Sequence, residues 1–375
     1  MSRCDRISDR VVDFASKDQS LDQSDAFVPP TTPTKQNVDI ITALASIFVC
    51  LRPRLPPSPG STPPLPAPSD PAASTHLLTR AFGWDNNAVF QHQDVHELLL
   101  LLMDQIDECF KNTPPLFPTY LPSLAQITIK QTITCCDVEF TSDSLDTSYC
   151  LQLPIAANLN DSLDEYFKAE DLSGDCQYDT DTGHGKQDAK KHLELAELPN
   201  YLFLQFCRTR SNKTKINDKM EVPASLNLEK YMPSSEPQHA HVQSSPPPPP
   251  PKYELTCVLV HSGTCDFGHY YVYIKTAAGH WFKLNDDSAT PCSWEHVSDE
   301  AKGGADSGSR SAFLCVYEAI PTADVPQPPR LDVDSRILLV KQRVDIIFPA
   351  ASSHRPTHKL VLGGGKLPIK IKDKT

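Results

Sequence analysis

The 375-residue sequence lacks an excess of positive charge: 35 Lys and Arg against 47 Asp and Glu leave a net charge of -12. Nucleic-acid binding needs a basic stripe that neutralises phosphates, so nucleic acid is excluded as the main partner. The sequence also lacks the run of about 18 apolar residues that a membrane-spanning helix needs. Its start, MSRCDRISDRVVDFASKDQS, has no apolar segment of a signal peptide. These absences predict a cytoplasmic or nuclear protein whose partner is another protein.

Cysteine is present, but it lacks the spacing of a disulfide framework or of a metal site. The 12 Cys are scattered, and without an export signal they are expected to be reduced thiols. Cys135 and Cys136 are adjacent, whereas Cys150 and Cys176 stand alone. Because a structural zinc ion takes four ligands in a characteristic spacing, the sequence predicts no metal and no cofactor.

Proline, by contrast, is abundant, with 35 residues, many of them in two low-complexity stretches. Residues 53–74 have the sequence PRLPPSPGSTPPLPAPSDPAAS, and residues 234–251 have the sequence SSEPQHAHVQSSPPPPPP. This composition predicts extended, polyproline-like, disordered insertions at the surface. The composition leaves open a second interpretation, in which they dock modules that bind proline motifs.

Outside these stretches, the pattern of apolar residues predicts helices first and strands afterwards. IITALASIFVCL at residues 40–51 is expected to form a buried helix. QDVHELLLLLMDQIDECFK at residues 93–111 predicts a second helix with a broad apolar face and with acids in its first turn, where the helix dipole favours them. Strands are predicted at residues 127–133, 149–153, 201–206, 253–261, 269–275, 280–284 and 313–318. This order indicates the α+β class.

One histidine, His269, opens a predicted strand in the stretch DFGHYYVYIK. A short turn at residues 277–279 follows, and the next strand ends at Asn285 and Asp286. Hairpin pairing brings the end of the second strand back beside the start of the first, so these side chains are expected near His269. A His held by an Asn or Asp is the base and its orienting group in a nucleophilic triad, whose third member is a Cys or Ser. A structural role for the histidine is the alternative.

Several blocks, taken in chain order between about residues 40 and 318, carry a resemblance to a known family. They include AFGWDNNAVFQHQDVHELLLLLMD, CCDVEFTSDSLDTSYCLQLPI, YELTCVLVHSGTCDFGHYYVYIK and WFKLNDDSATPCSWEHV. They resemble the Gln-Asp-x-x-Glu box, the start of the fingers and the His box of the ubiquitin-specific proteases, which are cysteine-type deubiquitinases. The resemblance is greatest to the branch without structural zinc. It implies a papain-like hand with a helical thumb, β fingers and a β palm.

The resemblance also implies roles for individual residues. His269 matches the general base, Asn285 the residue that orients it, and Asp286 its acidic neighbour. Asp94 and Glu97 match the acids that bind basic residues and the C-terminal tail of ubiquitin. If the resemblance is set aside, the alternative is that they are ordinary acids favoured by the dipole at a helix N-terminus. His261 matches a strand-end position with a structural or substrate-lining role.

The sequence departs from the family at the nucleophile. The family's Asn-x-Gly-x-Thr-Cys box is missing, and the best alignment puts Thr34 or Lys35 at the position of the catalytic Cys. Cys4 has little of the box around it, and Cys50 lies inside a predicted buried helix. Without a thiolate no thioester forms, so the chain as written is predicted to be inactive.

The chain is expected to divide into a divergent N-terminus (1–39), a protease-like domain (40–320) and a C-terminal extension (321–375). Three interpretations of its function follow. The first is a deubiquitinase whose nucleophile is displaced or is missing from an incomplete gene model. The second is a pseudoenzyme that binds ubiquitin, and the third is a proline-rich adaptor.

Overall fold

The computed structural model describes residues 35–51, 75–83, 94–111, 120–181, 183–233, 251–286 and 288–320. The chain divides into two compact units, one comprising 1–118 with 326–362 and the other 119–325 with 363–375. The first insertion (53–74), nearly all of the second, and the C-terminal extension beyond residue 320 lie outside the described residues. None of the helices in the described part is long and apolar enough to cross a membrane.

The first unit contributes three helices, α2 (Lys35–Leu51), α3 (His76–Ala81) and α4 (Val95–Lys111). Both helices predicted here are confirmed, although α2 begins five residues before residue 40. Ile40, Ala43 and Ala81 form the buried centre where α2 and α3 meet, and Leu102 of α4 packs against it. In α4 the side chains of Met103, Ile106 and Cys109 are buried at helical spacing, which is the periodicity that predicted the helix.

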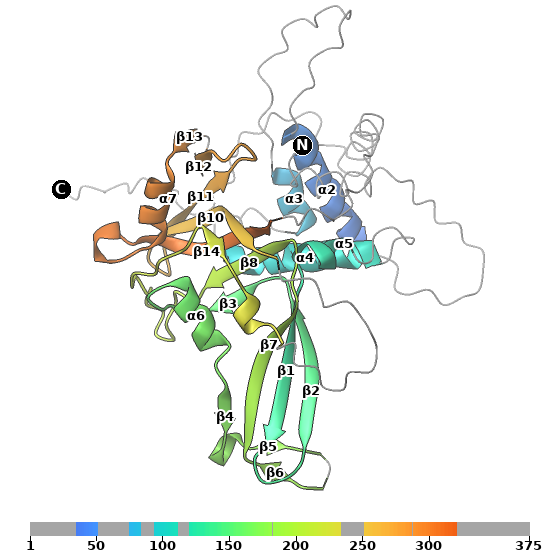
Figure 1. The fold of residues 1–375 in the computed structure, drawn as a ribbon. Coiled ribbons are helices and arrows are strands. Elements are labelled where there is room, and N and C mark those ends of the chain that lie inside the picture. The colour runs from blue at the N-terminus through green and yellow to red at the C-terminus, as the bar shows by residue number, and fades with distance from the viewer. Residues whose placement is uncertain are drawn as a thin grey trace, which may run out of the picture. The chain divides into compact units, whose positions relative to one another are not determined.

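An eight-stranded sheet forms the centre of the second unit, and we call it the palm sheet (Figure 1). Its strand order is β13-β12-β11-β10-β14-β8-β3, and the short β9 pairs with β10. The strands are β3 (Leu151–Leu153), β8 (Tyr201–Phe206), β9 (Ser225–Leu226), β10 (Tyr253–Gly263), β11 (Gly268–Lys275), β12 (Trp281–Asn285), β13 (Ser288–Cys292) and β14 (Arg310–Ala319). Only the pairing of β3 with β8 is parallel among the recorded pairs of this sheet.

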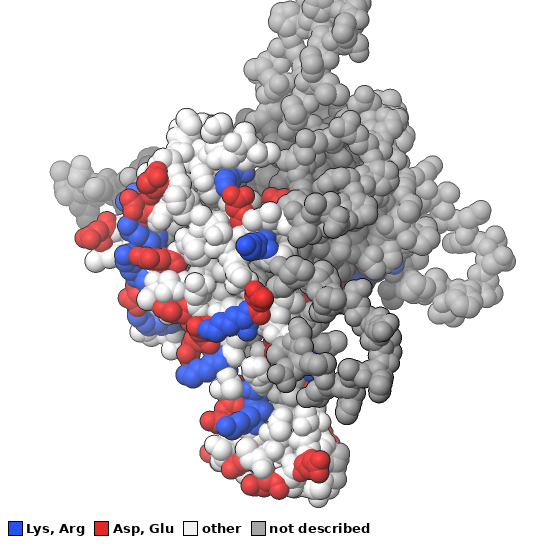
Figure 2. Space-filling model, in the orientation of Figure 1, with Lys and Arg blue, Asp and Glu red and all other residues white. Residues whose placement is uncertain are grey.

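A four-stranded sheet of the same unit extends away from the palm sheet, and we call it the finger sheet (Figure 1). Its order is β2-β1-β7-β4, from β1 (Ile127–Cys135), β2 (Thr141–Ser148), β4 (Glu170–Leu172) and β7 (Ala189–Glu197). A small ribbon of β5 (Tyr178–Asp179) and β6 (Lys186–Gln187) lies near its far end. Acidic side chains gather at this end, whereas cations and acids alternate closer to the palm (Figure 2).

Three short helices complete the second unit: α5 (Tyr120–Ala125), α6 (Leu159–Tyr166) and α7 (Trp294–Ala301). Single 3-10 turns occur at Gly174–Cys176, Glu229–Tyr231 and Ala305–Ser307. Asn158 caps α6 by accepting a hydrogen bond from the Asp161 amide at 2.9 Å, and Ser293 caps α7 by accepting one from the His296 amide at 3.3 Å. Such caps satisfy amides that have no partner inside the helix.

The core of the second unit lies on the palm sheet, where α6 and α7 contribute Leu159, Leu163 and Val297 to a cluster of strand residues. Several of its largest side chains are tyrosines, and their hydroxyls are paired: Tyr253 donates to the Pro199 carbonyl at 2.5 Å, and Tyr317 donates to the Pro223 carbonyl at 2.7 Å. Because a buried hydroxyl without a partner is destabilising, these bonds make a tyrosine-rich core stable. The core holds the strands that carry the candidate site.

Candidate active site

The hairpin of β11 and β12 positions the predicted base and its orienting residue. Its turn is closed by hydrogen bonds from the Thr276 amide to the His280 carbonyl and from the Gly279 amide to the Thr276 carbonyl, both 2.8 Å. Val272 pairs with Leu284. Because side chains alternate between faces, His269 and Asn285 lie on one face of the hairpin, as diagonal neighbours.

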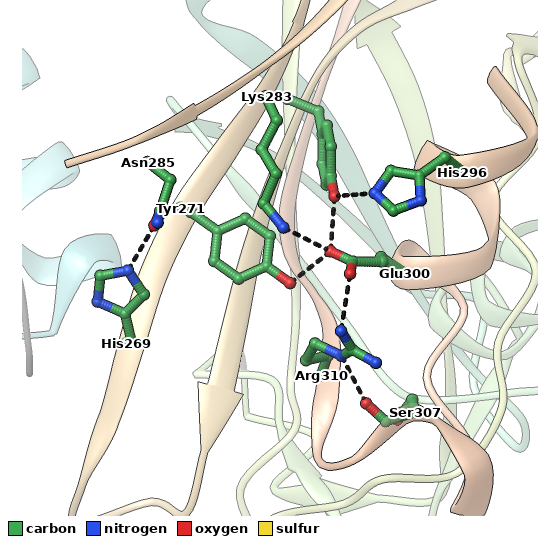
Figure 3. A network of polar contacts seen from close by, with 9 residues as sticks. His269, Tyr271, Lys283, Asn285, His296, Glu300, Ser307 and Arg310 are labelled. Atoms are coloured by element: carbon green, nitrogen blue, oxygen red, sulfur yellow. Dashed lines mark hydrogen bonds and ion pairs between the residues drawn. The ribbon is translucent and has the colours of Figure 1, made fainter. Parts of the chain in front are cut away.

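His269 and Asn285 form the contact that the hairpin predicts (Figure 3). His269 Nε2 lies 2.6 Å from Asn285 Oδ1. An amide oxygen only accepts hydrogen bonds, so Nε2 carries the proton and donates it. The neutral imidazole then has its lone pair on Nδ1, which is the atom that can take a proton from a nucleophile.

Asp286, the second residue expected beside His269, has a different setting. It is exposed and lies in the turn between β12 and β13. Its φ angle is 52°, in the left-handed region that Asp and Asn tolerate better than most residues. The position of Asp286 is that of a turn residue. The hydrogen bond to His269 is made by Asn285.

His261, implied to be structural or substrate-lining, is buried in β10 with 6% of its surface exposed. Its ring lies 4.7 Å from that of Tyr270 between centroids. A Cβ atom added to Gly268 would lie 1.9 Å from His261 Nε2. The glycine before His269 is therefore explained by the approach of this ring, and the burial favours the structural role.

Asp94 and Glu97 occupy the start of α4 in the other unit, and both are exposed. Asp94 Oδ1 accepts a hydrogen bond from the His96 amide at 2.8 Å, as an N-cap residue does. Burial lowers the pKa of His96, and the Asp94 carboxylate partly opposes this. The acids retain exposed carboxylate surface that a basic partner can contact.

Beside the pair lies a polar network that the sequence did not indicate, centred on Glu300 of α7 (Figure 3). Glu300 Oε2 accepts hydrogen bonds from the hydroxyls of Tyr271 and Tyr273, both at 2.6 Å, and from Lys283 Nζ at 3.2 Å. Arg310 Nη1 donates to Oε1 at 2.9 Å. A Glu near the end of a short helix resembles a surface residue in sequence, so no local signal marks this one.

Ten cysteines have described side chains, and none of these ten is in a disulfide. Burial raises the pKa of Cys109 and of Cys150 to about 12, and burial raises that of Cys315 well above its ordinary value. A thiol with a raised pKa is a poor nucleophile at neutral pH. The structure does not describe the candidate positions for the missing nucleophile. These are residues Cys4 and Thr34 and the side chains of Lys35 and Cys50.

In the part of the chain that the structure describes, no group of three or more His, Cys, Asp or Glu side chains is placed to hold a metal ion. Cys135 and Cys150 are buried, whereas Cys136 and Cys176 are exposed. The absence of zinc remains a prediction.

Comparisons with known proteins give this geometry a context. The sequence model of one family, described as ubiquitin carboxyl-terminal hydrolase, matches residues 8–317. Ubiquitin carboxyl-terminal hydrolase 7 of Drosophila melanogaster is 30% identical over 302 residues, which cover 73% of this chain and 25% of that protein. Ubiquitin carboxyl-terminal hydrolase 15 of Schizosaccharomyces pombe is 32% identical over 249 residues, which cover 64% of this chain and 21% of that protein.

A solved structure resembles the fold as well. It is the SAGA DUB module of Ubp8, Sgf11, Sus1 and Sgf73 bound to monoubiquitin, with a TM-score of 0.53 and 26% identity over 66% of this chain and 53% of that one. The papain-like fold expected from the sequence is confirmed. The chain spans about a quarter or less of the two hydrolases it matches.

Proposed function

Since this chain belongs to the ubiquitin carboxyl-terminal hydrolase family, we propose that it binds ubiquitin and that His269 and Asn285 form the base half of a cysteine-type deubiquitinase site. The observation that carries this proposal is the 2.6 Å contact between His269 Nε2 and Asn285 Oδ1. It leaves a lone pair on Nδ1 and fixes the ring, which are the two properties a general base needs.

The chemistry of such a site is thiol-dependent hydrolysis of linkages to the C-terminus of ubiquitin. With a thiol beside it, His269 Nδ1 would take the thiol proton, and the sulfur would attack the carbonyl carbon of the linkage. The proton passes from the imidazolium to the departing amine, and water then hydrolyses the thioester. Asn285 keeps the ring oriented through both steps, and hydrogen-bond donors stabilise the oxyanion.

We further propose that the chain as written is inactive in this reaction. The box that would supply both the thiol and an oxyanion donor is missing from the sequence, and the aligned position holds Thr34 or Lys35. A Thr without an adjacent activating amine is a poor substitute, and a base with water alone is a weaker catalyst than a covalent route. The proposed role is therefore ubiquitin recognition by a pseudoenzyme.

Titration calorimetry with monoubiquitin tests this function. Saturable binding that weakens when the C-terminal tail of ubiquitin is removed is the expected result, because the tail is the part that enters such a site. An absence of binding at ubiquitin concentrations up to about 1 mM, where the binding free energy is only about -4 kcal/mol, would favour the proline-rich adaptor instead.

A further inference from the structure

Glu300 joins the helix α7 to three strands of the palm sheet. Its donors come from β11 (Tyr271 and Tyr273), from β12 (Lys283) and from β14 (Arg310). Only 8% of the residue's surface is exposed. One carboxylate therefore fixes both strands of the hairpin that carries His269 and Asn285, together with the neighbouring β14.

The charge state of Glu300 supports this role. Burial alone would favour the neutral acid, but the hydrogen bonds from Tyr271 and Tyr273 and the charge of Lys283 outweigh it and lower the pKa of Glu300. The group is therefore a carboxylate at neutral pH. A buried carboxylate is stable only with such partners, and each of these bonds is charge-assisted and hence strong and directional.

Two of the partners of Glu300 are also same-face neighbours of the pair, each two residues along its strand. Tyr271 lies two residues after His269 on β11, with ring centroids 6.1 Å apart. Lys283 lies two residues before Asn285 on β12, and its Nζ is 4.0 Å from the centre of the Tyr271 ring. Each member of the pair thus has a neighbour that is bonded to the same carboxylate (Figure 3).

We propose that Glu300 is a positioning residue for the His269–Asn285 pair, which it keeps in hydrogen-bond register by clamping β11 to β12. This inference rests on the proposed function for its meaning, but its geometry concerns the free protein. The competing interpretation is that the network only holds α7 on the sheet. The two interpretations predict different results when the carboxylate is removed. If Glu300 positions the pair, the proton on His269 shifts from Nε2 towards Nδ1; if the network only holds α7, the tautomer is unchanged.

Long-range ¹H–¹⁵N correlation spectra of the imidazole, recorded without ubiquitin, test the proposal. The intact protein at about pH 8 should show His269 almost wholly as the Nε2–H tautomer. Glu300→Ala should raise the Nδ1–H population roughly tenfold, as expected when one hydrogen bond is weakened. Glu300→Gln keeps the size and one acceptor but removes the charge, and it should give a smaller rise; it decides the matter if the Ala variant does not fold.

The matched control is Asp299→Asn, which removes an exposed acid one position away on the same helix, where the Asp299 side chain is 69% exposed. It should leave the His269 tautomer unchanged. A lower melting temperature in the Glu300 variants with an unaltered tautomer would overturn the proposal. Failure of ubiquitin binding in calorimetry would contradict the proposed function and leave the tautomer result untouched, so the two failures are distinguishable.

Discussion

Gly268 shows how one missing atom shapes the candidate site. A Cβ there would lie 1.9 Å from His261 Nε2 and 2.7 Å from His261 Cε1. His261 is buried, so its ring has little room to move away. The glycine therefore allows His261 to pack beneath the start of β11, directly before His269.

Gly268→Ala is expected to lower the free energy of unfolding by about 1–3 kcal/mol, the usual effect of overpacking a filled site. The reason is steric, because the φ of Gly268 is outside the left-handed region. In a His261→Ala background the same change should have a much smaller effect, since the ring it meets is gone. Urea unfolding of the four proteins gives the coupling, and strictly additive effects would refute this account.

Lys215 joins β10 to the turn that precedes β14 through their backbone carbonyls. Its ammonium donates to the His261 carbonyl at 2.9 Å and to the Ser309 carbonyl at 2.6 Å. Burial, together with the positive charge of Arg208, lowers the pKa of Lys215 from 10.5 to about 8. Between these two values the unfolded chain binds more protons than the folded one, so this lysine makes stability rise with pH.

We therefore expect the stability of the intact protein, relative to Lys215→Met, to increase by about 1–2 kcal/mol between about pH 7.5 and 9.5. The comparison with the variant matters because buried thiols such as Cys150, whose pKa burial raises, act in the opposite direction. Urea midpoints at several pH values provide the measurement. Parallel pH profiles of the two proteins would show that Lys215 titrates normally.

The contacts of some single residues could be predicted from the sequence, and those of others could not. The contact of His269 with Asn285 was predictable because 16 residues of chain and one hairpin determine it. Glu300 was not, because its donors come from three strands and include Arg310, ten residues further along the chain. The roles of Asp94, Glu97 and Asp286 in binding or catalysis stay predictions.

Among the elements, α4 combines a structural and a proposed binding role in one residue. Asp94 caps the helix through the His96 amide and is also the acid expected to contact ubiquitin. An Ala variant would confound the two roles. Asn caps helices about as well as Asp, so Asp94→Asn separates charge from capping.

Asp94→Asn combined with Glu97→Gln should weaken ubiquitin binding in calorimetry by about 1.5–3 kcal/mol for each charge-assisted hydrogen bond lost. Thermal stability should change little, because the cap is kept. Asp104→Asn removes an exposed acid further along the same helix and serves as the control, with unchanged affinity. Equal affinity of the double variant and the intact protein would argue against α4 as a binding element.

Elements with regular apolar patterns were predictable, and those without were not. The strand predicted at 201–206 matches β8, whereas β2 was missed because TSDSLDTS has no apolar alternation and lies exposed at the sheet edge. The strand predicted at 149–153 begins only at Leu151, since a bend held by Ser148 precedes it. The short helices α6 and α7 depend on caps and tertiary packing more than on their own periodicity.

At the scale of the whole molecule, the α+β class and the family were predictable from ordered blocks of sequence, because a hand-like fold spreads its landmarks along the chain. Strand order was not, since β14 inserts between β10 and β8 across long stretches of sequence. The central claim also rests on the sequence: this chain of the family has the hydrogen-bonded pair His269 and Asn285 but lacks the nucleophile box.

The most direct test of that claim uses ubiquitin that carries a thiol-reactive group at its C-terminus, with intact-mass detection of a covalent adduct. The account predicts that the chain binds this probe and forms no adduct. Cys50→Ala and His269→Ala serve as controls, because modification of an unrelated thiol would survive loss of the base. An adduct that persists in Cys50→Ala but disappears in both His269→Ala and Cys4→Ala would contradict the account and identify a displaced nucleophile at Cys4.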